Sequence, residues 1–331
     1  MPRKGVIARK LRDMLRLSPK MYRKLVVRLS DTVEQKMCAN LWKEIDYSHV
    51  PSVAHSRLRK AFNRHDPEGY TQYIESVQKG DKKINASAIF PHDVIAKVNI
   101  KPWGNIAQIT GTERNSIIAQ WDSLPDYISG NESIIPVIDV SGSMVTPVSG
   151  NITAMDVAVS LGLYTSERLK GPFKDHFITF SSKPQIQHLS GDIVTRLESC
   201  VKSEWGMSTN LVRVFSQILS KAKQYNLSQD DMPSKVIIFS DMEFDQAINN
   251  GDATAFVAID KLYEQAGYTR PQLVFWNITG RSNSNTPVKI HDGGTALVSG
   301  FSPSILSSIM GGNLNPLSVV LKTIEKERYD H

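Results

Sequence analysis

The stretch Ile134-Ile135-Pro136-Val137-Ile138-Asp139-Val140-Ser141-Gly142-Ser143 decides how this chain folds. Its first five residues show no polar alternation and are too few for a typical helix, which predicts a strand buried on both faces of a parallel sheet. Asp139 marks the carboxyl end of that strand, the edge at which open α/β sheets bind ligands. Short Asp/Ser/Gly strings are common in turns, so this string alone is a weak signal.

Two later segments strengthen the signal. Asp241 directly follows a second apolar run, Val236 to Ser240. Thr209 comes just before residues whose spacing predicts an amphipathic helix, namely Leu211, Val214, Phe215, Ile218, Leu219 and Ala222. If the two strands are neighbours in the sheet, five oxygen-bearing side chains converge at one edge: Asp139, Ser141, Ser143, Thr209 and Asp241.

The pattern D-x-S-x-S, a later Thr and a later Asp after a strand resembles the metal-ion-dependent adhesion site (MIDAS) of von Willebrand factor A (vWA) domains. Longer strings resemble a family of uncharacterised intracellular proteins that join a helical region to a vWA domain, as the Ro ribonucleoprotein (TROVE) family does. The strings are Trp205-Gly206-Met207, Phe239-Ser240-Asp241-Met242, Val274-Phe275-Trp276-Asn277, Leu297-Val298-Ser299-Gly300-Phe301 and, in the helical part, Glu44-Ile45-Asp46-Tyr47, Val50-Pro51-Ser52-Val53-Ala54, His65-Asp66-Pro67 and Lys83-Ile84-Asn85-Ala86. One departure is Asn210, where such domains often carry Asp.

The resemblance implies both a fold and a ligand set. The implied fold is a doubly wound, mostly parallel, Rossmann-like vWA sheet preceded by an all-α region. The implied direct ligands are Ser141 and Ser143, with Asp139 and Asp241 binding directly or through water and Thr209 switching with ligand state. Such a set is too oxygen-rich for zinc but suits Mg²⁺ or Mn²⁺. The ion then keeps a position for an acidic group of a protein partner.

Charge divides the 331 residues into two parts. Residues 1–128 carry 22 Lys/Arg against 13 Asp/Glu, and the remainder carries 17 against 20, which together give the net charge of +6. Charge thus favours two domains, and the resemblance implies that they are a basic helical, TROVE-like region over 1–125 and a vWA domain over 126–331. The basic residues expected on solvent faces, and so available to a polyanion such as RNA, are Arg9, Lys10, Arg12, Arg16, Lys20, Arg23, Lys24 and Arg28.

The local patterns also predict individual elements. Alternating strand and helix signals after residue 134 indicate a mostly parallel sheet covered by helices on both faces. The strands are expected at Ile134 to Asp139, His176 to Phe180, Val236 to Phe239, Leu273 to Ile278 and Ala296 to Ser299, with an antiparallel edge strand at Ile186 to Leu189. The helices are expected near Thr153 to Lys170, Ile193 to Ser199, Leu211 to Tyr225, Ala255 to Ala266 and Ser302 to Met310.

The first part of the chain reads as helices. Ile7, Leu11, Met14 and Leu15 form an apolar stripe, and Ser18-Pro19 is typical of a capped helix start. Further helix starts are expected at a capping box of Asp31 with Glu34, at Asp66-Pro67, and at Pro91 for a helix running through Val98, with a linker over 123–133.

Cysteine use points to a reducing, cytoplasmic setting. Only Cys38 and Cys200 occur, in different predicted domains, and neither has CxxC spacing. The N-terminus lacks the apolar core of a signal peptide, and no 18-residue apolar stretch predicts a membrane span.

Two functional classes remain open: a non-enzymatic scaffold that recognises an acidic group through its metal site, and an RNA-binding protein of Ro-like type that uses the basic region. Self-association is left open. A metal-dependent nuclease or phosphatase is disfavoured, although Glu243 and Asp245 lie just past Asp241, because hydroxyls bridge two metals poorly and no general base or P-loop is evident.

Other candidate residues receive structural interpretations. His49, His55, His65 and His92 with Cys38 match no metal-ligand spacing, so we expect capping or surface roles. Trp42, Trp103, Trp121 and Tyr70 could stack on bases but are expected in the core.

Overall fold

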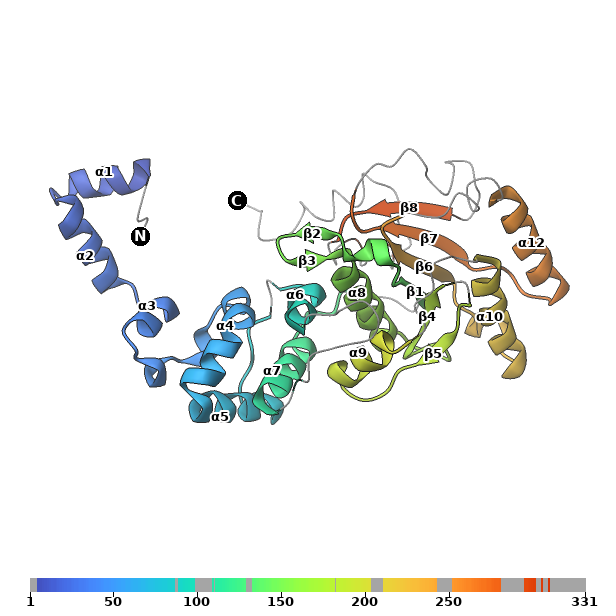
Figure 1. Cartoon of the computed structure of the whole chain (residues 1–331), viewed down its shortest axis with the longest axis horizontal. Helices are drawn as coiled ribbons and strands as arrows, with labels where there is room; N and C mark the ends of the chain where they lie inside the picture. The colour runs from blue at the N-terminus through green and yellow to red at the C-terminus, as the bar shows by residue number, and fades with distance from the viewer. Residues whose placement is uncertain are drawn as a thin grey trace. The chain divides into compact units, whose positions relative to one another are not determined.

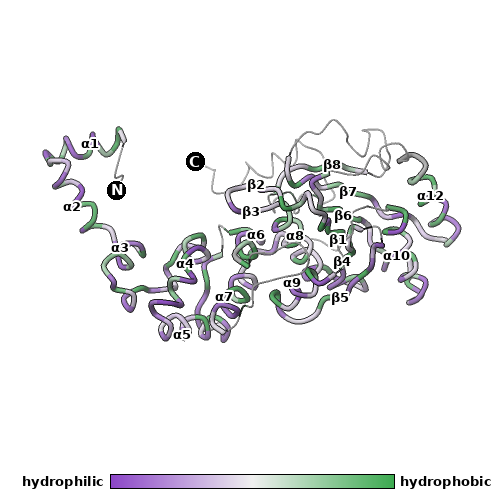
Figure 2. Tube along the Cα trace, viewed as in Figure 1, coloured by the Kyte–Doolittle hydropathy of each residue, from purple (hydrophilic) through white to green (hydrophobic). Residues whose placement is uncertain are grey.

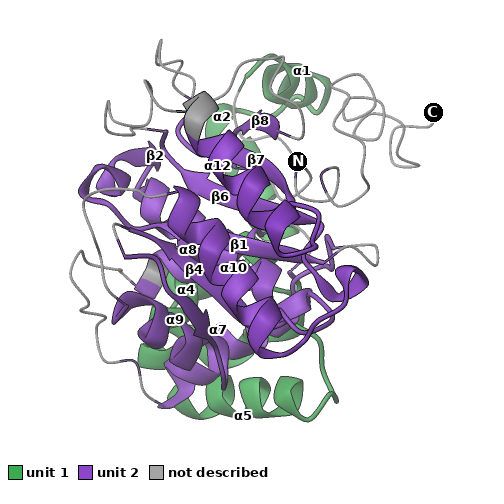
Figure 3. Cartoon of the chain, turned by 90° about the vertical axis from the view of Figure 1, so that its right-hand side faces the viewer, with its two compact units in different colours: residues 1–85 green, residues 86–331 purple. Residues whose placement is uncertain are grey.

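The computed structural model describes residues 5–86, 89–98, 109, 111–128, 133–181, 183–203, 211–242, 252–280, 295–301, 305 and 309. Packing divides the chain into two compact units, Met1–Asn85 and Ala86–His331, which Figure 3 colours separately. Each unit is described by itself below.

Unit 1 is helical throughout its described residues. Its α-helices are α1 (Val6–Met14), α2 (Pro19–Leu29), α3 (Val33–Cys38), α4 (Ser52–His65) and α5 (Pro67–Gln78), with 3₁₀ turns η1 (Trp42–Glu44) and η2 (Tyr47–His49). Ser18 caps α2 by accepting a hydrogen bond from the backbone N–H of Met21, and Asp66 caps α5 through Gly69. Both predicted helix starts are therefore confirmed.

The predicted capping box of α3 is wrong by one residue. The N-cap is Thr32, whose backbone N–H lies 3.5 Å from Oε1 of Gln35, in place of Asp31 with Glu34. Asp31 instead forms an ion pair with Lys36 at 3.3 Å. Asp31-Thr32 and Glu34-Gln35 each place two polar residues side by side. The capping-box spacing therefore fits the sequence in two registers that differ by one residue.

Two apolar clusters stabilise unit 1. The larger one packs the rings of Tyr47, Phe62, Tyr70 and Tyr73 around His55, and the Tyr47 hydroxyl donates to Asp66 Oδ2 at 2.9 Å. The smaller one joins α1 to α2 through Ala8, Tyr22 and Val26.

Unit 2 is built on a six-stranded sheet in the order β5-β4-β1-β6-β7-β8 (Figure 1). The strands are β1 (Ile134–Asp139), β4 (His176–Phe180), β5 (Ile186–His188), β6 (Lys235–Ser240), β7 (Gln272–Asn277) and β8 (Thr295–Ser299). All neighbours are parallel except β4 and β5, so the predicted antiparallel edge strand is confirmed. A hairpin of β2 (Pro147–Ser149) and β3 (Ile152–Thr153) was not predicted.

Helices cover both faces of this sheet. The described helices of unit 2 are α6 (Pro91–Ile95), α7 (Gly111–Asp122), α8 (Ala154–Arg168), α9 (Ile193–Val201), α10 (Leu211–Gln224) and α12 (Asp252–Gln265), with 3₁₀ turns η3 (Ala96–Val98), η4 (Gly142–Val145) and η5 (Gln229–Asp231). Helix α8 packs on β1, β4 and β6, whereas α10 and α12 share one apolar cluster with the opposite face, which includes Ile135 and Val137 of β1. The prediction of an α/β unit with a mostly parallel sheet is confirmed. The predicted helix at Ser302 to Met310 lies largely outside the described residues.

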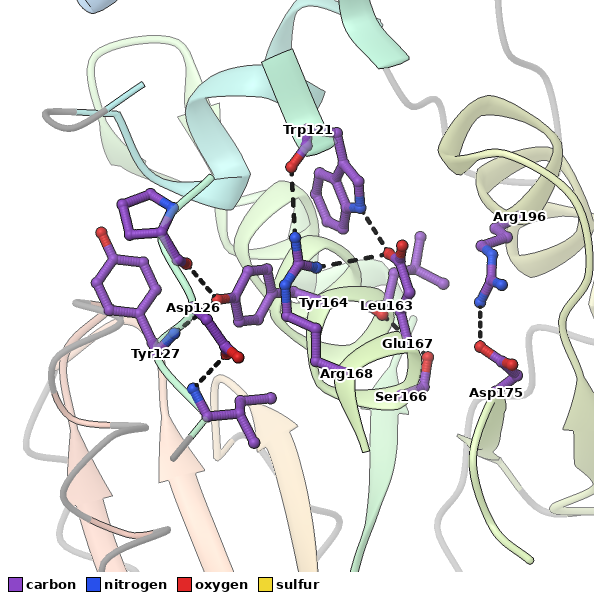
Figure 4. A network of polar contacts seen from close by, with 12 residues as sticks. Trp121, Asp126, Tyr127, Leu163, Tyr164, Ser166, Glu167, Arg168, Asp175 and Arg196 are labelled. Atoms are coloured by element: carbon purple, nitrogen blue, oxygen red, sulfur yellow. Dashed lines mark hydrogen bonds and ion pairs between the residues drawn. The ribbon is translucent and has the colours of Figure 1, made fainter. Parts of the chain in front are cut away.

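Helices α6 and α7 pack with α8 and α9, and so belong to the sheet-containing unit. Figure 4 shows one contact that holds α7 against α8, in which the Trp121 indole N–H donates to Glu167 Oε2 at 2.6 Å. Within α8, the Arg168 guanidinium lies 4.0 Å from the centroid of the Tyr164 ring. The Tyr164 hydroxyl donates to the carbonyl oxygen of Pro125 at 2.6 Å. The division at 125/126 remains a prediction.

Among the described residues, none of the helices combines the length and apolar composition needed to cross a bilayer.

Candidate metal centre

The predicted ligands on β1 and β6 meet at the carboxyl edge of the sheet. The two strands are parallel neighbours, and Ile138 pairs with Phe239, so Asp139 comes level with Ser240 and Asp241 follows at once. Both carboxylates are nearly inaccessible to solvent, with 4% and 3% of the residue exposed. The strands are buried because apolar residues occupy both faces, and the polar side chains begin only where the sheet ends.

Asp139 is fixed by hydrogen bonds from both strands. Its Oδ1 accepts from the Ser141 backbone N–H at 2.9 Å, and its Oδ2 accepts from the Ser240 hydroxyl at 2.6 Å. The Met242 backbone N–H donates to the same Ser240 oxygen at 3.0 Å. Ser240 was missed by sequence reasoning, although its place between a buried strand and a carboxylate was the available signal.

Ser141 and Ser143 bring their hydroxyl oxygens to 3.0 Å from each other across the start of the 3₁₀ turn η4. Mg²⁺ binds oxygens at 2.0–2.1 Å in octahedral geometry, so two adjacent ligands lie about 3.0 Å apart. The two hydroxyls are joined by a hydrogen bond at this 3.0 Å separation. Their oxygens therefore lie close enough to bind one ion together.

Burial makes the site electrostatically costly. It raises the pKa of Asp139 to about 6, and the neighbouring charge of Asp241 acts in the same direction. The hydrogen bonds from Ser240 and Ser141 lower that pKa but do not restore it to the ordinary range. A cation between the carboxylates would offset both unfavourable effects, so the donor chemistry fits a hard divalent ion.

The backbone beside the site is strained. Met242, a bulky buried residue, adopts φ 66°, in the left-handed region that side chains of this kind rarely occupy. Such conformations cluster at functional sites, where surrounding structure holds them in place.

Several sequence candidates are placed elsewhere or not at all. Thr209, Glu243 and Asp245 lie outside the described residues. Trp121 and Tyr70 are core residues, as predicted, whereas Trp42 is half-buried and Trp103 lies outside the described residues. The expected capping or surface role is wrong for His55 and His92, which are buried, whereas His49 and His65 are exposed. Within the described ranges, no group of three or more His, Cys, Asp and Glu side chains is arranged to hold a metal.

The basic residues of the N-terminal part lie on α1, α2 and the turn between them. Figure 2 shows that both helices mix strongly hydrophilic and hydrophobic residues. Arg12 is half-buried, and the others are exposed: Arg9, Lys10, Arg16, Lys20, Arg23, Lys24 and Arg28. The apolar stripe of α1 is only partly covered, since Ala8 is buried but Ile7 and Met14 are 65% and 80% exposed.

Comparison with known proteins gives two family matches. Residues 133–328 match a family described as a domain of unknown function (DUF7788), and residues 3–133 match another described as a domain of unknown function (DUF2828). The uncharacterized protein L728 of Acanthamoeba polyphaga mimivirus is 30% identical over 342 residues, which cover 97% of this chain and 57% of that protein. The chain therefore spans little more than half the length of this relative.

A solved structure is also similar. The crystal structure of the Deinococcus radiodurans RO (RSR) protein aligns with 88% of this chain and 64% of its own, at a TM-score of 0.45 and 18% identity.

Proposed function

Because the chain belongs to the DUF7788 family, whose function is unknown, we propose a function from the candidate metal centre: it is a non-enzymatic binding protein that holds Mg²⁺ or Mn²⁺ and recognises an acidic group of a protein partner. One observation carries the proposal. Two buried carboxylates, Asp139 and Asp241, lie at adjacent strand ends beside a pair of serine hydroxyls whose oxygens are 3.0 Å apart.

The residues that would hold the ion are Asp139, Ser141, Ser143 and Asp241, with Thr209 as the further ligand that the vWA resemblance supplies. Two ionised carboxylates would formally neutralise a divalent ion, but with water and neutral hydroxyls in the rest of the shell the ion would keep Lewis acidity and an exchangeable coordination position. An Asp or Glu carboxylate from a partner then completes the coordination. Hydroxyl-rich sites of this kind suit binding better than two-metal hydrolysis, which gathers bridging carboxylates.

The experiment is a thermal melt with and without Mg²⁺. A ligand that binds only the folded state stabilises it by RT ln(1 + [L]/Kd), about 2.7 kcal/mol at a hundredfold excess over Kd. We expect an upward shift of Tm in the wild type and none in Asp139→Ala. The matched control is Asp156→Asn, because Asp156 is also a buried carboxylate with a raised pKa but bonds to Thr153 as a helix cap. Its melts should still shift with Mg²⁺.

Two results would contradict the proposal. One is no Tm shift at millimolar Mg²⁺ or Mn²⁺ together with no heat of binding by calorimetry. The other is hydrolysis of nucleic acid or phosphoesters that survives purification and disappears in Asp241→Ala, which would make the protein an enzyme.

A second candidate function, RNA binding, rests on the exposure of seven of the eight predicted basic residues on α1, α2 and their turn. If about five phosphates are neutralised, the log–log salt slope of binding to single-stranded RNA is near −3.5, from about −0.7 per phosphate. Charge reversal of Arg12, Arg16, Arg23 and Lys24 should weaken binding equally for all sequences, because phosphate contacts do not read bases. RNA affinity weaker than about 10⁻⁴ M at physiological salt would eliminate this candidate.

A further inference from the structure

A cavity of about 260 Å³ lies between α1 and α2, in the unit that does not contain the metal centre. Ala8 and Tyr22, which pack in the small α1–α2 core, line it together with three arginines, Arg9, Arg12 and Arg23. Pockets for drug-sized ligands begin at about 300 Å³, so this cavity suits a smaller group.

The arginines reach the cavity for a simple geometric reason. Arg9 and Arg12 are three residues apart on α1 and therefore lie on one face of the helix, next to the buried Ala8. Arg23 comes from α2, one residue after the buried Tyr22. Two helices thus direct guanidinium groups toward the same space.

Existing contacts orient two of these side chains without consuming all their donors. The Arg23 Nε donates to the carbonyl oxygen of Pro19 at 3.3 Å. Arg12 donates to Oδ1 of Asp13 from Nε and Nη2, at 3.1 and 2.9 Å, which offsets part of its charge. The first thirty residues contain ten Lys/Arg and a single acid, Asp13, so this part of the chain carries a strong net positive charge. Each guanidinium has five N–H donors, which leaves capacity for a ligand.

The amino end of α1 adds to the positive electrostatic potential at the cavity. Its N-cap is Gly5, which also lines the cavity; no side chain of the described residues caps the helix, and its first turn contains no acid. The first N–H groups of a helix carry partial positive charge and favour an anion.

We propose that this cavity binds the terminal phosphate of a small phosphorylated molecule. Arginine forks match phosphate oxygens, and a phosphomonoester presents three such oxygens with nearly two charges at pH 7, whereas a phosphodiester presents two oxygens with one charge. A hollow below the size of ordinary ligand pockets favours a chain end or headgroup over a continuous strand. This proposal concerns a different site from the proposed cation site. An experiment can therefore contradict one of the two proposals and leave the other intact.

The test is a ³¹P NMR titration of the full chain with methyl phosphate, dimethyl phosphate and inorganic phosphate. The pocket variant is Arg9→Ala/Arg23→Ala. The matched control is Arg57→Ala/Arg64→Ala, which removes the same charge from exposed positions on α4, outside both the cavity lining and the predicted polyanion-binding residues. We expect saturable binding of methyl phosphate, at least about tenfold weaker in the pocket variant and within about twofold of wild type in the control, because hydrogen bonds to charged groups are worth a factor of ten or more.

Two further binding experiments identify the class of molecule that carries the phosphate. Vesicles that carry a phosphoinositide monophosphate, and a short RNA with and without a 5′-phosphate, are compared in the same variants. Loss of vesicle or 5′-phosphorylated RNA binding only in the pocket variant supports the inference. It is overturned if dimethyl phosphate or RNA without the terminal phosphate binds as well as methyl phosphate, if both variants lose affinity equally, or if no saturable binding occurs.

Discussion

Gly162 of α8 lies directly against the strand that ends in Asp139. A Cβ at this position would lie 2.4 Å from Cδ1 and 2.5 Å from Cγ1 of Ile138. Glycine is required here by close approach between helix and sheet, since the backbone angle of Gly162 is not in the left-handed region. This single absent side chain fixes how near α8 comes to β1.

The first prediction is that Gly162→Ala destabilises the protein by about 1–3 kcal/mol through overpacking. Adding Ile138→Ala removes the colliding atoms, so the double variant should be more stable than the sum of the two single effects predicts. Urea denaturation of the four proteins measures this coupling. If the changes in unfolding free energy of the two single variants add exactly, α8 does not contact Ile138 as closely as the structure shows.

His55 carries a second residue-scale prediction. Burial, with the nearby charge of Arg59, lowers the pKa of His55 to about 3, so its imidazole is neutral in the folded state. The unfolded chain binds a proton near pH 6.5. The contribution of neutral His55 to the free energy of unfolding is therefore fully present above pH 6.5. It is lost as the pH drops from 6.5 toward 3, by on the order of a few kcal/mol.

The variant His55→Phe keeps an aromatic ring against Phe62, Tyr70 and Tyr73 but cannot titrate. Its unfolding free energy should depend less on pH between 6.5 and 4 than that of the wild type, as followed by circular dichroism. His65→Gln, an exposed position on the same helix, should keep the wild-type pH profile. Equal acid sensitivity in the wild type and His55→Phe would refute this account.

At the scale of elements, α7 is attached to α8 by a small polar network at a buried aromatic residue (Figure 4). Trp121 is 1% exposed, and its indole N–H bonds to Glu167, which also lies 3.5 Å from Arg168. Arg168 in turn donates to the carbonyl oxygen of Trp121. The helix α7 thus depends on two consecutive charged residues at the end of α8.

We predict that Glu167→Ala destabilises the protein by about 1–3 kcal/mol, because it leaves a buried indole donor without its acceptor. Glu264→Ala, which removes an exposed carboxylate near the end of α12, should change the urea midpoint little. Matching losses in the two variants would show that the contact with Trp121 contributes nothing specific.

The sequence predicted best the largely buried strands. The bounds of β1 and β4 were predicted correctly because both are rich in apolar residues and too short for a typical helix, whereas β6 extends one residue beyond each predicted end. The hairpin β2–β3 was missed because its residues are exposed or half-buried and carry no alternating pattern. At the metal centre, the loop residues Ser141 and Ser143 were identifiable, whereas Ser240 was not, because a hydroxyl inside a strand signals no partner until the register with Asp139 is known.

At the scale of the whole molecule, the two possible divisions of the chain make different physical claims. Cutting at 125/126 separates α6 and α7 from the sheet, whereas the packing assigns both helices to unit 2, Ala86–His331. Arg114 of α7 donates to Asp192 at 2.7 Å and to Thr195 Oγ1 at 2.7 Å, both at the start of α9. Local periodicity contains no information on such contacts, because they join residues almost eighty positions apart.

The final prediction compares two fragments, 86–331 and 126–331. The longer one retains the bonds of Arg114 to α9 and of Trp121 to Glu167, so it should unfold cooperatively, with a Tm that rises with Mg²⁺ if the metal centre binds it. The shorter one exposes the surfaces of α8 and α9 that α6 and α7 cover, including the acceptor carboxylates Asp192 and Glu167. It should melt at a lower temperature or fail to fold, as measured by circular dichroism and calorimetry. Equal stability of the two fragments would instead place α6 and α7 with the helical region, because their contacts with α8 and α9 would then contribute no free energy to the sheet unit.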